Sequence, residues 1–452
     1  IASYDCSSVP LLKDVKESFN KIFVSTGATN DSEIEEASKI LEGSDFSFLH
    51  CVSQYPTPLN EYHLSRIDYL KSLCKNVGWS DDLISKTKFV DEANLAIKMS
   101  EVDVVVEATG FPAAGIEHAR QAFQNGKHII MVNVEADVLA GAALVKEARS
   151  AGVVYSMAYG DQPALTAEIV EWARASGFHV SSAGKGTRYL PAYHKSTPDT
   201  VWDYYGLSHE EASKAGMNPK MFNSFLDGTK SGLEMAAIAN ACGLEVPNDG
   251  LLFPPCGMDD LANILKPSKF GGVLEQNGQV EVVSSLERDG RPVFKDLRWG
   301  VFAVLEAPND YAASCFKQYG MNTDSTGQFS AMYKPFHLIG MELNISIFSA
   351  ALLNQATGQT QRFIGDVVST TKRNLKKGEI LDGEGGATVW GKLIPAKLSL
   401  SLEALPIGLA HGIKLKNEVK ENEIIKWSDV EFSPTDPAIS YRRSMEADAK
   451  IL

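Results

Sequence analysis

Short apolar runs alternate with helical stretches over the first 160 residues, and this alternation constrains the fold more than any other feature. The runs are KIFVSTG (21–27), FSFLHC (46–51), VDVVVEATG (102–110), HIIMVNVE (128–135) and VVYSMAYGD (153–161). Helix-like segments such as AGIEHARQAFQNGKH separate them. The βαβα order predicts an α/β fold with a parallel sheet covered by helices.

The rest of the chain changes character twice. Residues 162–350 are richer in Gly, Pro, Tyr and Trp, which indicates an α+β substrate domain. Within it, residues 279–307 predict a hairpin of two long strands turned at Asp289-Gly290. From about residue 360 the pattern is short strands and turns, and TTKRNLKKGEIL (370–381) echoes KLKNEVKENEII (414–425). This echo predicts a small all-β module with two related arms, against the alternative of two similar surface hairpins.

Composition limits the class of partner. The chain has 452 residues, 44% of them hydrophobic and 22% charged, with a net charge of −14. Such an acidic chain is expected to bind neither nucleic acid nor an anionic membrane as its main partner. No apolar run approaches the ~18 residues of a membrane span, no secretory signal is visible, and the six cysteines form no C-x-x-C pair. We therefore expect a cytoplasmic protein with reduced thiols.

Two family resemblances cover different parts of the chain. From about 88 to 432 it resembles the homoserine dehydrogenase-like oxidoreductases that include deoxyxylulose phosphate reductoisomerase-like enzymes. The segments that carry this likeness include VVVEATG, GKHIIMVNVEADVLAG, AGKGTRYLPAYHKSTPDTVWDYYG, NPKMFNSFLDGTKSGLEMA and YKPFHLIGMELNISI. The stretch that begins DVVSTTKRNLKKGEILDGEGG resembles the SAF domain, which implies a β-clip tail.

Residues 1–81 resemble instead the later part of a sialic acid synthase barrel, through IASYDC, KIFVSTG, LHCVSQYPTPLNEYHLSRI and VGWSD. In that family Ser25 and Ser80 match positions near the phosphoenolpyruvate, whereas Asp82 stands where a metal-binding imidazole is expected. No G-x-G-x-x-G loop follows any early strand, so the Rossmann-like sheet is expected to have an incomplete first half. A fusion, a truncation or a mis-assembled reading frame would each account for this junction.

These observations predict five segments in chain order. They are a partial synthase-like βα segment (1–81), the second half of an NAD(P)-binding Rossmann-like domain (82–161), a catalytic α+β domain (162–359), a SAF domain (360–432) and a tail (433–452).

Residues at the carboxyl ends of the predicted strands are the cofactor candidates, because ligands of open α/β sheets bind at that edge. Gly110 lets a backbone approach closely, and Thr109 offers a hydroxyl. The alternative for this segment is a plain strand-to-helix turn. The predicted contacts to NADP or NAD are Ala108, Thr109, Gly110, Asn133, Glu135 and Pro163.

Two later segments are the catalytic candidates. In AGKGTRYLPAYHKSTPDT, Lys185 lies between two glycines, and a fixed ammonium stabilises the negative charge that hydride transfer leaves on oxygen. In DGTKSGLE, Asp227 can cap a helix that carries Lys230 and Glu234, and the resemblance implies that a Lys and an acid here bind the substrate and move its proton. The predicted catalytic residues are Lys185, Tyr189, Asp227, Lys230 and Glu234, and the predicted substrate contacts are Thr187, Arg188, His194, Lys195 and Thr229.

A solvated basic loop and a helix cap are the alternatives for these two segments, and for His337 a structural hydrogen bond is expected rather than catalysis. The resulting hypothesis is an NAD(P)-dependent oxidoreductase, expected to be a homo-oligomer, that acts on a small, phosphorylated polyol or hydroxy-carbonyl compound such as a sugar phosphate. A divalent metal is possible by analogy with the reductoisomerases, although no tight cluster of ligands demands one. The competing hypotheses are a sialic acid synthase-like protein and an inactive fusion product.

Overall fold

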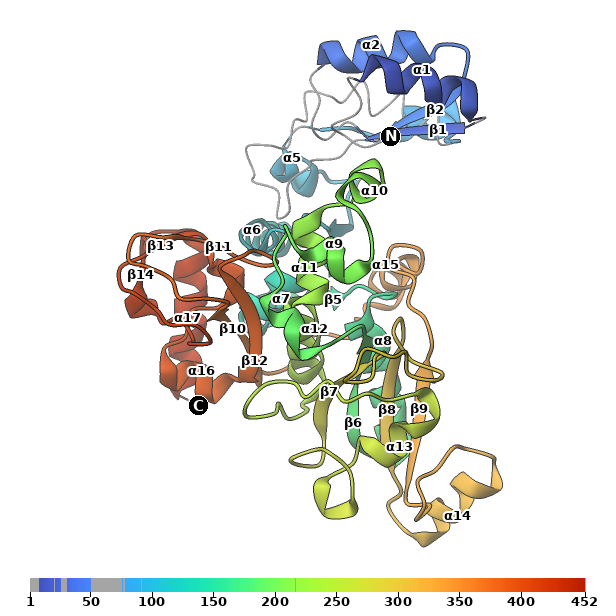
Figure 1. The fold of residues 1–452 in the computed structure, drawn as a ribbon, viewed down its shortest axis with the longest axis vertical. Coiled ribbons are helices and arrows are strands. Elements are labelled where there is room, and N and C mark those ends of the chain that lie inside the picture. The colour runs from blue at the N-terminus through green and yellow to red at the C-terminus, as the bar shows by residue number, and fades with distance from the viewer. Residues whose placement is uncertain are drawn as a thin grey trace. The chain divides into compact units, whose positions relative to one another are not determined.

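The computed structural model describes residues 8–19, 21–25, 31–49, 75, 78–90, 92–215 and 217–451. The chain divides into two compact units (Figure 1). Unit 1 comprises Ile1–Met99 and Pro198–Phe222, and unit 2 comprises Ser100–Thr197 and Asn223–Leu452. Residues 26–27 of the predicted run KIFVSTG lie outside the described residues, and so do residues 50–74 and 76–77.

The described part of unit 1 has two parallel strands and several helices. Its elements are α1 (Val9–Ser18), β1 (Lys21–Ser25), α2 (Asp31–Leu41), β2 (Asp45–Leu49), α4 (Asp81–Lys86), α5 (Ala93–Lys98), α9 (Val201–Tyr205) and α10 (His209–Lys214). β1 pairs with β2 in parallel, with Lys21 opposite Asp45. Leu12, Ile34 and Leu41 bury their side chains between these elements, as the helical spacing of the apolar residues predicts. Ser80 caps α4 by accepting a hydrogen bond from the Leu83 N–H.

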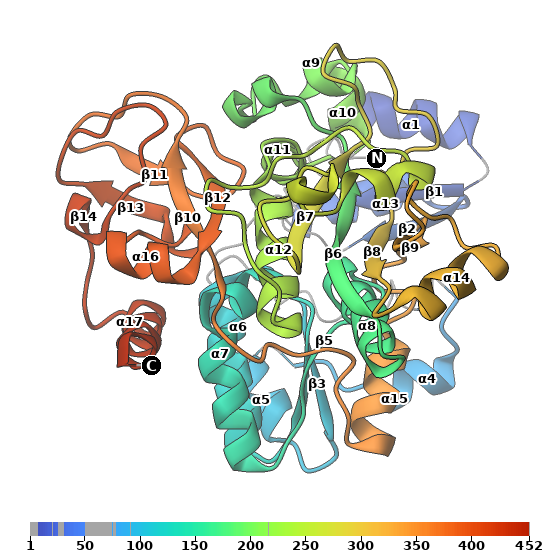
Figure 2. The same ribbon diagram turned by 90° about the horizontal axis from the view of Figure 1, so that it is seen from below.

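The first sheet of unit 2 is parallel, in the order β3 (Val104–Glu107), β4 (His128–Met131), β5 (Tyr155–Met157). α6 (Pro112–Gln124) and α7 (Val134–Ala151) cover one face, and α15 (Asn344–Leu353) packs against the other (Figure 2). The Rossmann-like α/β class is therefore confirmed, and among the described strands this sheet has three members. Glu135 belongs to the first turn of α7 rather than to the strand before it.

The second sheet of unit 2 has the order β7 (Gln279–Ser284), β6 (His179–Thr187), β8 (Val301–Glu306), β9 (Phe329–Lys334). The predicted hairpin of residues 279–307 is wrong, because β6 lies between its two strands, parallel to β7 and antiparallel to β8. The turn at Asp289-Gly290 exists, with the Gly290 N–H donating to the Glu287 carbonyl. A Cβ added to Gly184 would lie 1.8 Å from the Glu281 carbonyl oxygen, so glycine is required on this central strand.

Two helices cover one face of this second sheet. They are α8 (Gln162–Ala175) and α12 (Thr229–Cys242). The remaining elements of the middle region are η4 (Pro191–Lys195), α11 (Pro219–Leu226), η5 (Met258–Asp260), α13 (Leu261–Ile264), η6 (Ser268–Phe270) and α14 (Asp310–Gln318).

The C-terminal β-module, residues 365–431, is made of two small antiparallel sheets that contain β10 (Gly365–Thr371), β11 (Ile380–Asp382), β12 (Val389–Pro395), β13 (His411–Leu415) and β14 (Val430–Glu431). The two echoing segments pair with each other: the Leu375 N–H donates to the Val419 carbonyl and the Val419 N–H to the Leu375 carbonyl. These residues hold equivalent positions in the two segments, so the repeat forms two opposed arms. The assignment of this module to the SAF family stays a prediction.

The module is built into unit 2. β10 and β12 pack against α12, and α17 (Pro437–Ile451) packs on α6 and α7. The fully buried Arg442 of α17 donates to the Asp366 carboxylate at 2.6 Å and to the Leu139 carbonyl at 3.0 Å. Short helices α16 (Ala396–Leu402), η7 (Ile407–Leu409) and η8 (Trp427–Asp429) complete it. No helix among the described residues is both long and apolar enough to cross a membrane.

Candidate active site

The carboxyl ends of β3, β4 and β5 form the edge of the sheet at which the candidate site lies. Thr109-Gly110, Asn133 and Asp161 follow the three strands in turn. Gly110 has φ +68°, a left-handed conformation that glycine adopts without strain. Ala108 is exposed beside it, so the backbone of this turn is accessible at the edge where α/β proteins bind cofactors.

The polar side chains of this edge are engaged within the protein. The Thr109 hydroxyl donates to Glu107 at 2.6 Å. The Asn133 amide donates to the Phe111 carbonyl at 3.0 Å, while its oxygen accepts from the Ala136 N–H and so caps α7. Burial raises the pKa of Glu107, but hydrogen bonds from His118, Thr109 and Asn133 outweigh it and leave this pKa below its ordinary value. Thr109 and Asn133 therefore shape the turns, and the accessible backbone is left as the candidate for cofactor contact.

Two buried ion pairs meet behind this edge. Lys185 of β6 pairs with Glu234 of α12, and its ammonium also donates to the Gln162 side-chain oxygen at 3.1 Å. Lys185 is 6% exposed and Glu234 is 4% exposed. α12 starts at Thr229, so Lys230 and Glu234 are four residues apart and lie on the same face of the helix.

The second pair joins Lys230 to Glu135 of α7 at 2.6 Å. Asp161 is close enough to both pairs for their charges to act on it. Burial is the largest cause that raises the pKa of Asp161, and the charge of Glu234 raises it further, whereas the charge of Lys230 lowers it. The resulting pKa is about 6. We call Lys185, Lys230, Glu135, Asp161 and Glu234 the lysine cluster.

This cluster suits proton transfer to a carbonyl oxygen. The two ammonium groups are fixed by carboxylates in a site with little water, where a cation stabilises a developing oxyanion strongly. Asp161 titrates near neutrality, which is the range in which a carboxyl group acts best as a general acid or base. The prediction that Lys185, Lys230 and Glu234 act together is consistent with this geometry.

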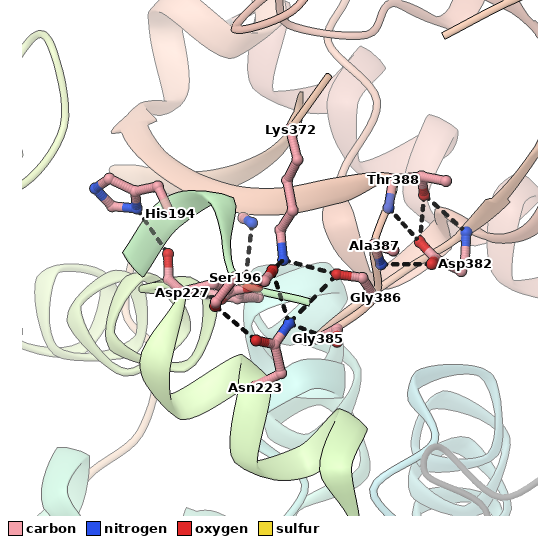
Figure 3. A network of polar contacts seen from close by, with 12 residues as sticks. His194, Ser196, Asn223, Asp227, Lys372, Asp382, Gly385, Gly386, Ala387 and Thr388 are labelled. Carbon is pink, nitrogen blue, oxygen red and sulfur yellow. Dashed lines mark hydrogen bonds and ion pairs between the residues drawn. The ribbon is translucent and has the colours of Figure 1, made fainter. Parts of the chain in front are cut away.

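Asp227 lies outside the lysine cluster. One of its carboxylate oxygens accepts from Lys372 of the C-terminal β-module at 2.7 Å, and the other accepts from the Thr229 N–H at 2.9 Å (Figure 3). The residue is fully buried. Both oxygens are thus used to hold the start of α12. This arrangement suits the helix cap, which was the alternative for this segment, better than it suits a role in proton transfer.

Tyr189 and His194 form a separate aromatic group. The Tyr189 hydroxyl lies 3.0 Å from His194 Nε2, and His194 Nδ1 lies 2.7 Å from the Asp227 carbonyl oxygen. His194 stacks on Trp390, and Tyr189 stacks on Phe253, with ring centroids 4.0 Å apart in each pair. His194, Phe253 and Trp390 line a cavity of about 210 Å³. Burial raises the pKa of Tyr189 and lowers that of His194, so both rings are neutral at pH 7.

The other predicted substrate contacts are dispersed. Lys195 pairs at the surface with Glu421 at 2.5 Å. The Thr229 hydroxyl accepts from the Gly391 N–H at 2.8 Å and so binds the C-terminal β-module. Arg188 lies 3.5 Å from the Tyr193 hydroxyl, and Thr187 ends β6. His337 has the expected structural contact, its Nδ1 lying 2.7 Å from the Trp299 carbonyl oxygen.

Three residues of the site carry no assigned chemistry in the sequence prediction. Asp161 and Gln162 follow the end of β5, so their position after a strand is the signal that could have identified them. Glu384, in the DGEGG loop of the C-terminal β-module, is within the electrostatic reach of Glu135 and Lys230. No local pattern marks it, because its neighbours in the fold are about 150 to 250 residues away in sequence.

The residues present fit the nicotinamide end of a dinucleotide at the Ala108–Gly110 turn, where the positive φ of Gly110 and the exposed Ala108 leave backbone accessible. Pro163, also a predicted contact, is in the first turn of α8. Among the described residues, no group of three or more His, Cys, Asp or Glu could hold a metal ion.

Comparisons with known proteins match three segments of the chain to family models. Residues 70–158 match the family model of the homoserine dehydrogenase NAD-binding domain, and residues 160–343 match that of the oxidoreductase DRL catalytic domain. Residues 1–90 match the NeuB family. The chain thus joins an NAD-binding domain and an oxidoreductase catalytic domain to a NeuB-family segment. The NAD-binding and catalytic-domain matches support a general NAD(P)-dependent oxidoreductase.

Curated relatives match the N-terminal segment. The chain is 42% identical over 85 residues to an uncharacterised protein of Methanocaldococcus jannaschii and 38% identical over 87 residues to the N,N'-diacetyllegionaminic acid synthase of Campylobacter jejuni. Each match covers 18% of this chain and about a quarter of the relative (25% and 26%). The chain therefore spans only a small part of these proteins.

Solved structures with similarity include oxidoreductases. A putative oxidoreductase from Bacteroides fragilis is 15% identical over 75% of this chain and 91% of its own, with a TM-score of 0.26. The 1-deoxy-D-xylulose 5-phosphate reductoisomerase of Zymomonas mobilis, in complex with NADPH, is 15% identical over 50% of this chain and 55% of its own, with a TM-score of 0.22. TM-scores this low do not establish a shared overall structure.

Proposed function

We propose that this chain reduces or oxidises a small hydroxy-carbonyl compound with NAD(P), and that the reaction takes place at the lysine cluster. The observation that supports this most directly is the pairing of the buried Lys185 and the half-buried Lys230 with carboxylates behind the carboxyl edge of the sheet, both lysines within a segment that matches an oxidoreductase catalytic domain. A bound nicotinamide would supply or accept the hydride.

The residues of the chain bind and polarise the reacting oxygen. In the reducing direction the carbonyl carbon gains a hydride and its oxygen gains a proton. Lys185 would donate a hydrogen bond to this oxygen, and Lys230 would add a second positive charge nearby. Asp161 or Glu234 would deliver the proton, and in the oxidising direction the same carboxyl group would accept it.

Lys185→Met tests this assignment. Its removal is expected to lower turnover by about 100-fold or more, as loss of one oxyanion-stabilising donor does, with little change in cofactor affinity. NADPH oxidation would be followed with deoxyxylulose phosphate, aspartate semialdehyde and glyceraldehyde as substrates. The matched control is Lys317→Met, on the exposed surface of α14.

Cofactor binding is measured separately, by titrating NADH and NADPH into the protein and following fluorescence. Saturable binding below millimolar concentration is expected. No binding of either cofactor at millimolar concentration would contradict the proposed function.

A further inference from the structure

The loop between β11 and β12 carries a buried carboxyl group with one unpaired oxygen. Glu384 is 8% exposed, and its Oε1 is fully buried without a hydrogen-bond partner among the described residues. Its carboxyl group has a side-chain hydrogen bond with Ser224. Buried polar atoms are nearly always paired, so an unpaired one indicates a ligand or a functional role.

The loop holds Glu384 firmly. Asp382 accepts from the Ala387 N–H at 2.6 Å and from the Thr388 N–H at 3.0 Å, which closes the loop on itself. A Cβ at Gly386 would lie 2.2 Å from the Asp382 carboxylate, so only glycine fits there. This makes the loop a fixed support for Glu384, as opposed to a surface turn.

Side chains outside the loop hold it in place. The Lys372 ammonium donates to the Gly386 carbonyl at 2.7 Å and to Asp227 at 2.7 Å, and the Asn223 amide donates to the Gly385 carbonyl at 2.9 Å (Figure 3). Because Asp227 also holds the start of α12, the same contacts fix Glu384 and Lys230 relative to each other.

Burial and nearby charges raise the pKa of Glu384. Glu135, Asp161, Glu234 and Glu384 are four carboxyl groups near two ammonium groups, Lys185 and Lys230, while Lys372 is neutralised by Asp227. Burial first, and then the charge of Glu135, raise the pKa of Glu384, against the opposing charge of Lys230; Asp227 adds to the increase. A protonated Glu384 can both donate and accept a hydrogen bond.

We propose that Glu384 is a substrate-binding residue, inserted into the active site by the C-terminal β-module, and that it hydrogen-bonds a hydroxyl group of an unphosphorylated sugar or polyol. This inference rests on the proposed function. Even without Glu384, the carboxyl groups of Glu135, Asp161 and Glu234 outnumber the ammonium groups of Lys185 and Lys230. This balance disfavours a phosphate beside Glu384, whereas a neutral hydroxyl can use the unpaired Oε1. The substrate is therefore expected to carry no phosphate group beside Glu384.

Glu384→Leu separates a binding role from a structural one. The substitution removes an unpaired buried polar group, so the melting temperature is expected to stay the same or rise. Affinity for deoxyxylulose or xylitol, measured by calorimetry in the presence of NADP⁺, is expected to fall by about 10-fold, and Glu384→Gln should restore part of it. The control is Glu418→Gln, an exposed carboxylate of the same module.

Wild-type protein is expected to bind deoxyxylulose more tightly than deoxyxylulose phosphate. The inference is overturned by a preference for the phosphate ester, by the absence of binding to deoxyxylulose and xylitol, or by a Glu384→Leu variant that loses thermal stability in step with affinity. NADPH titration of the same variants keeps the two proposals apart. Normal NADPH binding together with any of these results refutes the role of Glu384 alone, while loss of NADPH binding in the wild type refutes the proposed function.

Discussion

Replacing Lys372 by Met should loosen the C-terminal β-module and the start of α12 together. Lys372 is 5% exposed, and its ammonium donates to Asp227, to the Ser196 carbonyl and to the Gly386 carbonyl, each at 2.7 Å. Met keeps the aliphatic stem but leaves the Asp227 carboxylate buried without its cation. Breaking a buried pair in this way costs about 3–5 kcal/mol.

Amide hydrogen exchange of the native protein measures this cost where it arises, because a chain with two units need not unfold in one step. A loss of about 3–5 kcal/mol corresponds to exchange that is faster by about 100-fold or more in peptides that cover β10, β12 and the first turn of α12. The double variant Lys372→Met/Asp227→Asn should recover much of this protection, since it removes both charges.

Lys392→Met is the matched control, because Lys392 belongs to the same module but its partner Asp249 is 95% exposed. An exposed pair contributes about 0–1 kcal/mol, so protection should change by less than about 5-fold. If Lys372→Met changed the exchange no more than Lys392→Met, the buried pair would not be what joins the module to α12.

Two further predictions concern other parts of unit 2. Burial raises the pKa of Glu281 to about 7 from an ordinary value of 4.5, so the folded protein keeps a proton that the unfolded chain releases, and stability falls as pH rises from about 4.5 to 7. Glu281→Gln should remove up to about 3 kcal/mol of this loss of stability. The melting temperature of the variant is therefore expected to exceed the wild-type value at about pH 8 but not at about pH 4. Gly115→Ala should destabilise by about 1–3 kcal/mol and weaken NADPH binding, because the added Cβ would lie 2.6 Å from the Cβ of Ala136 and force α6 away from α7; unchanged melting and NADPH affinity would refute that packing argument.

Local patterns predicted the elements of this fold well, and long-range pairing poorly. The runs HIIMVNVE and VVYSMAYGD form the buried parallel strands β4 and β5, because burial on both faces demands apolar residues at successive positions. The supposed hairpin of residues 279–307 failed because β6, about 100 residues earlier, takes the place between its strands. The glycines that flank Lys185 are needed for this close strand packing rather than to free its side chain.

The site shows the same limit. Lys185, Lys230 and Glu234 could be predicted because two short segments carry them, but the charges that set their chemistry come from elsewhere. Asp161 follows a different strand, and Glu384 comes from the C-terminal β-module. The electrostatic balance of the cluster therefore depends on tertiary contacts that no local spacing encodes.

The contacts of Lys185 indicate how a substrate oxygen could reach an ammonium that is already paired. Lys185 donates to the charged Glu234 and to the neutral amide oxygen of Gln162. The ion pair with Glu234 has a Coulomb attraction that the bond to the neutral amide oxygen lacks, so Gln162 is the partner that a substrate would displace. Glu234 would then stay in place, hold the Lys185 ammonium in position before the substrate binds, and remain beside the oxygen to which a proton is transferred. On this argument the buried ion pair prepares Lys185 for catalysis, and the replaceable contact with Gln162 marks where the reacting oxygen binds.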